Sequence, residues 1–157
     1  MCDKIYMIVY IEVIFLSKYS DRAVELFMEG KNCSQAVFAA FAPDLGLSEE
    51  TALAVSVGLG GGVGRMREVC GAVSGSAMLV GLKYPEFDKT EVYAKVRMII
   101  DEFKKTNHSI VCKELLGMSK PETSSVPEAR TEEYYQKRPC VKIVEDAALA
   151  VEKVLFE

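Results

Sequence analysis

The sequence has no tryptophan and a single histidine, His108. One histidine cannot supply a bis-histidine haem, a three-histidine zinc centre or an HExxH protease site within one chain. Charge is nearly balanced, with 19 basic and 23 acidic residues and a formal net charge of −4. Nucleic acids and anionic membranes attract proteins with a basic surplus, so we expect neither as a partner.

Long hydrophobic runs are also missing. Residues 5–16 are apolar except for Glu12, and this run is too short to span a bilayer. Asp3 offsets Lys4 and no small-residue cleavage site follows, so the run does not resemble a secretory signal. We expect residues 1–19 to be an N-terminal extension, either a strand or helix added to the domain or non-native upstream residues. The expected compartment is the cytoplasm, where thiols are kept reduced.

What the chain does have is the composition of one globular domain: 157 residues, 50% hydrophobic and 27% charged. Apolar residues from position 20 onward recur with helical spacing, which predicts an all-α, single-domain bundle of about six helices over residues 20–157. The third helix should be buried, and 118–139 should be a surface excursion with one helical turn near Tyr134. The expected helices cover 20–30, 33–42, 51–57, 66–82, 90–105 and 140–156, with a short one at 113–117.

Four of the five cysteines fall at or near predicted helix starts: Cys33, Cys70, Cys112 and Cys140. Unpaired N–H groups and the helix dipole favour a thiolate there, which suits both metal ligands and redox thiols. No two of them form a Cys-x-x-Cys pair, so local sequence does not assemble the site. Each could equally be a small buried hydrophobic residue. Cys2 lies outside the helical domain and is interpreted as incidental.

A glycine-rich loop, residues 58–64, precedes the Cys70 helix. It follows a predicted helix rather than a strand and ends in Gly64-Arg65-Met66, which argues against a nucleotide-binding loop. We expect the loop to fold tightly beside Cys70, with Arg65 or Arg67 near a thiol or a bound group. The candidate cofactor-binding residues are Gly60, Gly61, Gly62, Gly64, Arg65 and Gly71.

Two further features have alternative interpretations. Gly71 and Gly75 weaken the helix that contains them, so either another helix or a cofactor should approach its backbone closely. His108, four residues before Cys112, is the one histidine available as a base or ligand, although a residue in such a loop is more often merely exposed.

The order of these motifs resembles the C_GCAxxG_C_C family of redox-active proteins. The matching stretches are Asn32-Cys33-Ser34-Gln35-Ala36, Cys70-Gly71-Ala72-Val73-Ser74-Gly75, Cys112-Lys113-Glu114-Leu115-Leu116-Gly117 and Cys140, within residues 20–155. The resemblance implies a helical domain with redox-active or metal-binding cysteines. It implies no particular substrate, and the absence of Cys-x-x-Cys-His gives no reason to expect covalent haem.

Three functions are then open. In the first, Cys33, Cys70, Cys112 and Cys140 converge on one electron-transfer site as ligands of an iron–sulfur cluster. In the second, two of the four form a cofactor-free thiol–disulfide couple. In the third, the chain is a non-enzymatic helical module, with a structural zinc or no metal, whose Gly71–Gly75 face packs a partner helix. The electron-transfer partner is unknown, and whether a homodimer completes the site is left open.

Overall fold

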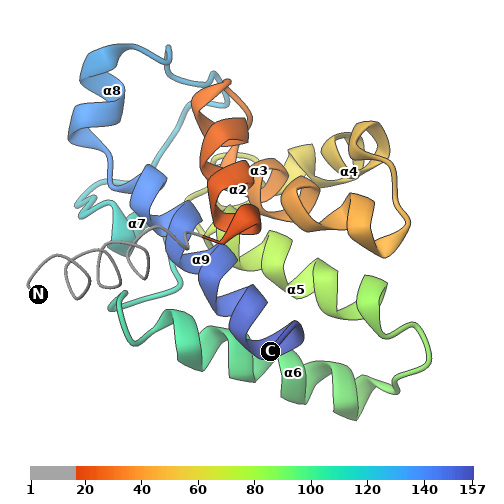
Figure 1. Cartoon of the computed structure of the whole chain (residues 1–157). Coiled ribbons are helices and arrows are strands. Elements are labelled where there is room, and N and C mark those ends of the chain that lie inside the picture. Colours follow the sequence, from red (N-terminus) through yellow and green to blue (C-terminus); the bar gives the residue numbers. More distant parts are fainter. Residues whose placement is uncertain (1–16) are drawn as a thin grey trace, which may run out of the picture.

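The computed structural model describes residues 17–157, and this part of the chain is a helical bundle (Figure 1). No strand occurs between residues 17 and 157, where the only β-type pairing is an isolated antiparallel bridge between Val69 and Val111. The predicted all-α fold is confirmed. The α-helices are α2 (Lys18–Met28), α3 (Cys33–Phe41), α4 (Glu49–Ser56), α5 (Gly71–Lys83), α6 (Lys89–Phe103), α7 (Cys112–Leu115), α8 (Glu132–Lys137) and α9 (Cys140–Leu155), with two 3-10 turns, η1 (Ala42–Leu45) and η2 (Val57–Leu59).

Helices α3 and α9 organise the core. Helix α3 packs against α2, α4, α5 and α9, and α9 also packs against α2, α5 and α6. The large side chains that the bundle buries fully include Phe27, Phe41, Leu79 and Val144. Burying each such side chain contributes roughly 1.5–3 kcal/mol, so this interior holds the helix starts in fixed positions.

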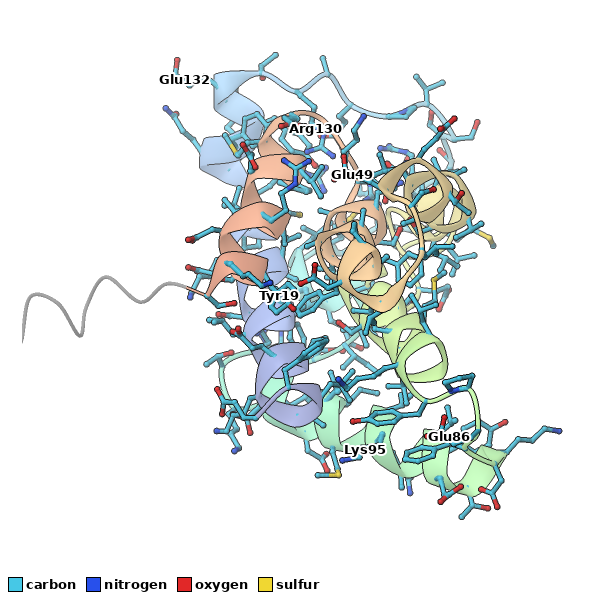
Figure 2. The ribbon with its side chains drawn as sticks, turned by 45° about the vertical axis from the view of Figure 1, so that its right-hand side comes forward. Tyr19, Glu49, Glu86, Lys95, Arg130 and Glu132 are labelled. Atoms are coloured by element: carbon cyan, nitrogen blue, oxygen red, sulfur yellow. The ribbon has the colours of Figure 1, made fainter. Side chains whose placement is uncertain are left out.

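Aromatic side chains close the opposite end of the bundle from the glycine loop. Tyr19 on α2 stacks on Phe41, with ring centroids 4.2 Å apart, and Phe156 packs against both rings (Figure 2). The Tyr19 hydroxyl donates to Asp44 at 2.8 Å. These contacts attach the first and last described helices to the end of α3.

The crossing of α3 and α5 explains the glycines in α5. A Cβ at Gly75 would lie 2.8 Å from the carbonyl oxygen of Ser34 on α3, closer than real Cβ atoms approach other atoms. The prediction that something approaches this backbone closely is therefore confirmed, and the neighbour is another helix. Because α3 covers the Gly71–Gly75 face of α5, this face is not available to a helix of another protein. The expectation that it packs a partner helix is therefore wrong.

The glycine-rich loop after η2 has an unusual backbone. Positive φ angles occur at Gly61, Gly62 and Gly64, and also at the non-glycine residues Val63, Arg65 and Arg67. The loop is held by its own hydrogen bonds, such as those from the Gly64 N–H to the Gly58 carbonyl and from the Arg67 N–H to the Gly61 carbonyl. Such a backbone turns repeatedly within a few residues and keeps the loop close to the starts of α3 and α5.

The segment between α7 and α9 is more than a surface excursion. It contains α8, which confirms the helical turn near Tyr134, and it returns across one end of the bundle beside α2 (Figure 1). Arg130 donates to the Lys31 carbonyl at 3.2 Å and Tyr135 to the Met28 carbonyl at 3.3 Å. These bonds attach the segment to the end of α2.

Some expectations differ in detail. The third helix was expected to be buried, and this is wrong: only Ala52 and Ser56 of α4 are buried, while Val55 is 55% exposed. The helix expected at 66–82 begins only at Gly71, because the loop continues to Cys70. Helix α2 begins two residues earlier than expected, capped by Ser17. The prediction for residues 1–19 otherwise lies outside the described residues, as does Cys2. No helix within residues 17–157 has the length and apolar character that a membrane crossing needs.

Candidate functional site

All four cysteines of the helical domain line one cavity of about 370 Å³. Cys33, Cys112 and Cys140 are the first residues of α3, α7 and α9, and Cys70 is the residue that precedes α5. The predicted placement at helix starts is therefore confirmed for all four. All four are free thiols in this structure. The fold brings together four thiols that are far apart in sequence.

Cys33 is positioned by a cap on α3. The Asn32 side chain accepts from the Gln35 N–H, and the Gln35 side chain accepts from the Asn32 N–H, which forms a capping box. Asn32 also donates to the Val57 carbonyl at 2.8 Å, so the cap is attached to the chain just before the glycine loop. This arrangement fixes the first turn of α3 and the direction of the Cys33 side chain.

The Cys33 sulfur lies among hydrogen-bond donors that favour its thiolate. The pKa of Cys33 is lowered to about 6, chiefly by a hydrogen bond from the Cys70 side chain and also by the N–H groups of Gly61, Cys33 itself and Ala72, against the opposing effect of burial. Donors from the glycine loop and from the start of α5 thus converge on one sulfur. The lowered pKa favours the thiolate form of Cys33 at neutral pH.

The pKa of Cys70 is shifted in the opposite direction from that of Cys33. Its pKa is raised well above the usual value because it donates its proton to Cys33, because it is buried and because the Cys33 charge is close. One proton is therefore held on Cys70 beside one negative charge on Cys33. This is the arrangement of an attacking thiolate next to a protonated second thiol.

Gly71 makes this contact possible. A Cβ at Gly71 would lie 2.9 Å from the Cys33 sulfur and 2.9 Å from the Leu59 carbonyl oxygen. The absence of a side chain at this position lets Cys33 lie against the first turn of α5. Gly71 thus shapes the site by its lack of a side chain and is not itself in the cavity wall.

Cys112 is held close to Cys70 by the pairing of their backbones. The Cys70 N–H donates to the Ile110 carbonyl at 2.8 Å and the Cys112 N–H to the Glu68 carbonyl at 2.6 Å. The Cys112 sulfur accepts from Arg67 Nη1 at 3.9 Å. Burial nevertheless raises the pKa of Cys112, and the Arg67 guanidinium offsets only part of this effect.

Cys140 is the fourth thiol of the cavity. Burial, followed by the negative charge of Cys33, raises the pKa of Cys140 to about 12, so it stays protonated at neutral pH. Of the four cysteines, only Cys33 is therefore ionised under ordinary conditions.

The glycine loop forms part of the cavity wall, and the cofactor-binding role expected of its residues stays a prediction. Gly60, Gly61, Gly64 and Arg65 line it. Gly62 is a different case, because it packs behind the wall, where a Cβ would lie 2.8 Å from Cys112 Cβ. His108 is exposed, contacts the Glu114 carbonyl at 3.2 Å and does not line the cavity.

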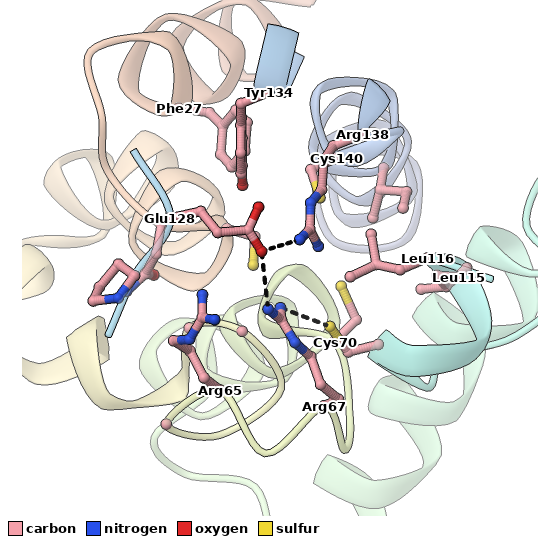
Figure 3. A pocket seen from close by; sticks show the side chains of 18 of the residues that line it. Phe27, Arg65, Arg67, Cys70, Leu115, Leu116, Glu128, Tyr134, Arg138 and Cys140 are labelled. Carbon is pink, nitrogen blue, oxygen red and sulfur yellow. Dashed lines mark hydrogen bonds and ion pairs between the residues drawn. The ribbon is translucent and has the colours of Figure 1, made fainter. Parts of the chain in front are cut away.

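Sequence reasoning missed the part of the wall that comes from the segment between α7 and α9. Glu128, Tyr134 and Arg138 line the cavity (Figure 3). Arg130 lines it as well. Glu122 joins them indirectly, since its carboxylate pairs with Arg65 at 2.7 Å and with Arg67 at 3.1 Å. The one signal in the sequence was Arg138, which precedes the Pro139-Cys140 helix start.

The donors do not gather tightly enough for a metal as they stand. Among residues 17–157, no three Cys, His, Asp or Glu side chains form a group that could hold a metal ion. The four thiols share a cavity, and the largest cause of the lowered Cys33 pKa is its interaction with Cys70.

Comparison with known proteins agrees with the order of the motifs. No curated protein and no solved structure matches the chain. A family model described as "Putative redox-active protein (C_GCAxxG_C_C)" matches residues 31–154, which include all four cavity cysteines. The chain belongs to the C_GCAxxG_C_C family.

Proposed function

We propose that this protein carries out thiol–disulfide exchange through Cys33 and Cys70. The observation that carries the proposal is the position of the Cys33 sulfur, which lies against Gly71, the residue next to Cys70, in a cavity that both thiols line. The lowered pKa of Cys33 and the raised pKa of Cys70 agree with a thiolate on Cys33 and a proton on Cys70. A nucleophilic thiolate next to a second thiol is what such exchange requires.

In the proposed reaction a small or protein-borne disulfide, R–S–S–R, is the oxidant. The Cys33 thiolate attacks one sulfur, so that a Cys33–S–S–R bond forms, the R–S–S–R bond breaks and RS⁻ leaves. Cys70 then transfers its proton to a departing thiolate and attacks the Cys33 sulfur. A Cys33–Cys70 disulfide forms and the second RS⁻ leaves to take a proton from water. Two electrons pass from the protein to the disulfide, and a dithiol reductant reverses the process.

The other two thiols suit a supporting role. Cys112 and Cys140 face the same cavity, and their raised pKa values keep them protonated while Cys33 reacts. They therefore do not compete as nucleophiles at neutral pH. A dithiol resting state fits the cytoplasm, where thiols are kept reduced.

An iron–sulfur cluster held by Cys33, Cys70, Cys112 and Cys140 is the second candidate. The observation in its favour is that four thiols from four helix starts line one cavity. Their chemistry fits such a cluster, whereas their positions do not, because no three of them form a metal-holding group within residues 17–157. Binding a cluster would require the cavity to contract around it. Zinc at the same cysteines would require the same movement.

Reaction of the full chain with bis(2-hydroxyethyl) disulfide, followed by acid quenching and peptide mass spectrometry, tests the first candidate. We expect one intramolecular disulfide, between Cys33 and Cys70. Cys33→Ser should abolish the reaction, and Cys70→Ser should stop it at a mixed disulfide on Cys33. Cys112→Ser and Cys140→Ser are the matched controls and should still form the bridge.

The result that would overturn exchange at this pair is a bridge elsewhere, or undiminished reaction of Cys33→Ser. Iron, zinc and acid-labile sulfide, measured in the same chain purified without oxygen, test the second candidate. Iron and sulfide that disappear in each of the four serine variants would replace the first candidate with the cluster. Metal-free protein that forms the Cys33–Cys70 bridge would reject the cluster.

A further inference from the structure

The cavity around Cys33 carries more positive than negative charge. Four arginines line it: Arg65, Arg67, Arg130 and Arg138. Glu122 and Glu128 are the carboxylates paired with them. A cavity with this surplus attracts anions.

Of these four arginines, Arg130 is the one that forms no ion pair with a carboxylate among residues 17–157. Its guanidinium lies over the rings of Phe27 at 4.3 Å and Tyr134 at 4.8 Å, which hold it in place. One nitrogen, Nη2, donates to the Lys31 carbonyl. The other, Nη1, is buried and has no hydrogen-bond partner among residues 17–157. A charged donor in this state needs an acceptor, and a ligand can supply one.

Arg67 provides a second unsatisfied donor. Its side chain is only 7% exposed, and its Nη2 pairs with Glu122. Its Nε is buried without a hydrogen-bond partner in the described part of the chain. Arg67 also contacts the Cys112 sulfur, so this donor lies on the side of the cavity where the thiols are.

Glu128 shows that arginines of this cavity wall, Arg67 and Arg138, bind a carboxylate. Its carboxylate lies between Arg67 and Arg138 and pairs with both (Figure 3). The Glu128 side chain is 45% exposed and belongs to the segment between α7 and α8, so it occupies this position from the solvent side. A ligand carboxylate at Arg67 would compete with Glu128 for this guanidinium.

The rest of the cavity sets the size and polarity of the ligand. A volume of about 370 Å³ suits a small molecule. Apolar side chains, including Phe27, Leu115, Leu116 and Ile143, complete the wall. The ligand should thus combine a short apolar part with a terminal negative charge.

We propose that the cavity selects small disulfides that carry carboxylates, with Arg130 and Arg67 binding the carboxylate and Cys33 attacking the disulfide. This inference rests on the proposed exchange at Cys33 and Cys70, and it names the class of oxidant. The bonds formed and broken are those of that exchange, with R an alkyl carboxylate.

Three small symmetric disulfides that differ mainly in charge test the selectivity: 3,3′-dithiodipropionate, bis(2-hydroxyethyl) disulfide and cystamine. Rates of Cys33–Cys70 bridge formation in the full chain are divided by the rates of the same disulfides with free 2-mercaptoethanol, which removes their intrinsic reactivities. We expect the anionic disulfide to be favoured about tenfold over the neutral one, with the cationic one slowest.

Variants that change the charge of single side chains show which residues cause the preference for the anionic disulfide. Arg130→Gln should remove most of the preference for the anionic over the neutral disulfide. Glu128→Gln removes the competing carboxylate and should increase the preference. Arg97→Gln, an exposed position on α6 away from the cavity, changes net charge as Arg130→Gln does and should have no effect.

A binding measurement separates this inference from the exchange reaction. The unreactive thioether 3,3′-thiodipropionate should protect Cys33 from iodoacetamide, and its neutral counterpart thiodiglycol should not. Equal normalised rates for the three disulfides, with no protection by the thioether, would overturn the anion selectivity and leave exchange standing. Protection by the thioether without any Cys33–Cys70 bridge would instead reject the exchange and retain an anion site.

Discussion

The Cys33 sulfur occupies the space into which a side chain on Gly71 would extend, 2.9 Å from where its Cβ would be. The contact joins the first residue of α3 to the first residue of α5. Because the Cys70 side chain and the Ala72 N–H both donate to the same sulfur, the whole first turn of α5 depends on this position being glycine.

Gly71→Ala should therefore damage the site and the fold together. The added methyl group has to displace Cys33 or the Leu59 carbonyl, so we expect the free energy of unfolding to fall by about 1–3 kcal/mol. We also expect the Cys33 pKa to rise, because the donors no longer reach its sulfur. Urea denaturation and the pH dependence of iodoacetamide alkylation measure the two effects.

Gly81→Ala is the matched control, since Gly81 lies in the same helix and a Cβ there would have no atom within 4 Å. It should raise stability by up to about 1 kcal/mol, the helix preference of alanine over glycine, and leave Cys33 unaffected. Equal behaviour of the two variants would show that the close approach at Gly71 has no energetic consequence.

The pH dependence of Cys33 provides a second prediction. Its pKa of about 6 lies below its ordinary value of 9.0, so alkylation should increase from pH 5 to 7 and then level off. Cys70→Ala removes the largest cause of the shift and should move this rise to higher pH. Cys140→Ala leaves the donors on Cys33 in place and should keep the midpoint near 6. A midpoint near 9 in the unmodified chain would contradict the proposed thiolate.

The same shift predicts a pH-dependent stability. Because the Cys33 pKa is lower in the folded than in the unfolded chain, its thiolate stabilises the fold fully above pH 9. The contribution decreases as pH falls and is lost below about 6. The stability difference between the unmodified chain and Cys33→Ala, measured by denaturation, should therefore increase between pH 6 and 9. A stability difference that stays constant between pH 6 and 9 would argue against a stabilising Cys33 thiolate.

Two capping boxes allow a test of how Cys33 is positioned. Asn32 caps α3 beside the cavity, and Asp88 caps α6 far from it. In each box the side chain of the third helical residue accepts a hydrogen bond from the backbone N–H of the cap. Asn32→Ala and Asp88→Ala should each cost about 1 kcal/mol of stability. Only Asn32→Ala should slow the alkylation of Cys33, because only that cap sets its direction. If both variants alkylate at the rate of the unmodified chain, the α3 cap has no part in positioning the thiol.

The backbone of the glycine loop predicts a stabilising substitution. Val63 has a φ of 59°, a conformation that β-branched residues rarely adopt, and its side chain is 43% exposed. Val63→Gly relieves a strain of about 1–3 kcal/mol and costs about 0.5–1 kcal/mol in chain entropy, so stability should rise by about 1 kcal/mol. Val55→Gly, in the exposed part of α4, should lower stability instead, because glycine weakens a helix. A loss of stability in both would mean that the loop backbone is not strained at Val63.

Local features of the site could be predicted from the sequence because their signals lie next to the residues they position. Asn32 before Cys33 and Pro139 before Cys140 are helix-start signals, and both starts occur where expected. The pairing of Cys33 with Cys70 was not predictable in this way. It depends on how α3 crosses α5, and Gly71 and Gly75 indicated a close approach without identifying what approached.

The errors have physical reasons as well. Leu53, Val55 and Val57 suggested a buried third helix, but α4 packs through the small residues Ala52 and Ser56 and leaves Val55 exposed. The wall formed by Arg130 and Tyr134 was missed because its segment is polar and lacks helical periodicity. Contacts with α2, far away in sequence, are what bring that segment to the cavity.

The donors around Cys33 also determine when its reactivity arises. Its sulfur depends on Gly61, Cys70 and Ala72, all of which follow it in the chain by more than twenty positions. A nascent chain that has only α2 and α3 outside the ribosome has an ordinary, mostly protonated thiol at Cys33. The low pKa of Cys33 thus arises only when α5 docks, and before that step the thiol is no more acidic than one on an unfolded chain.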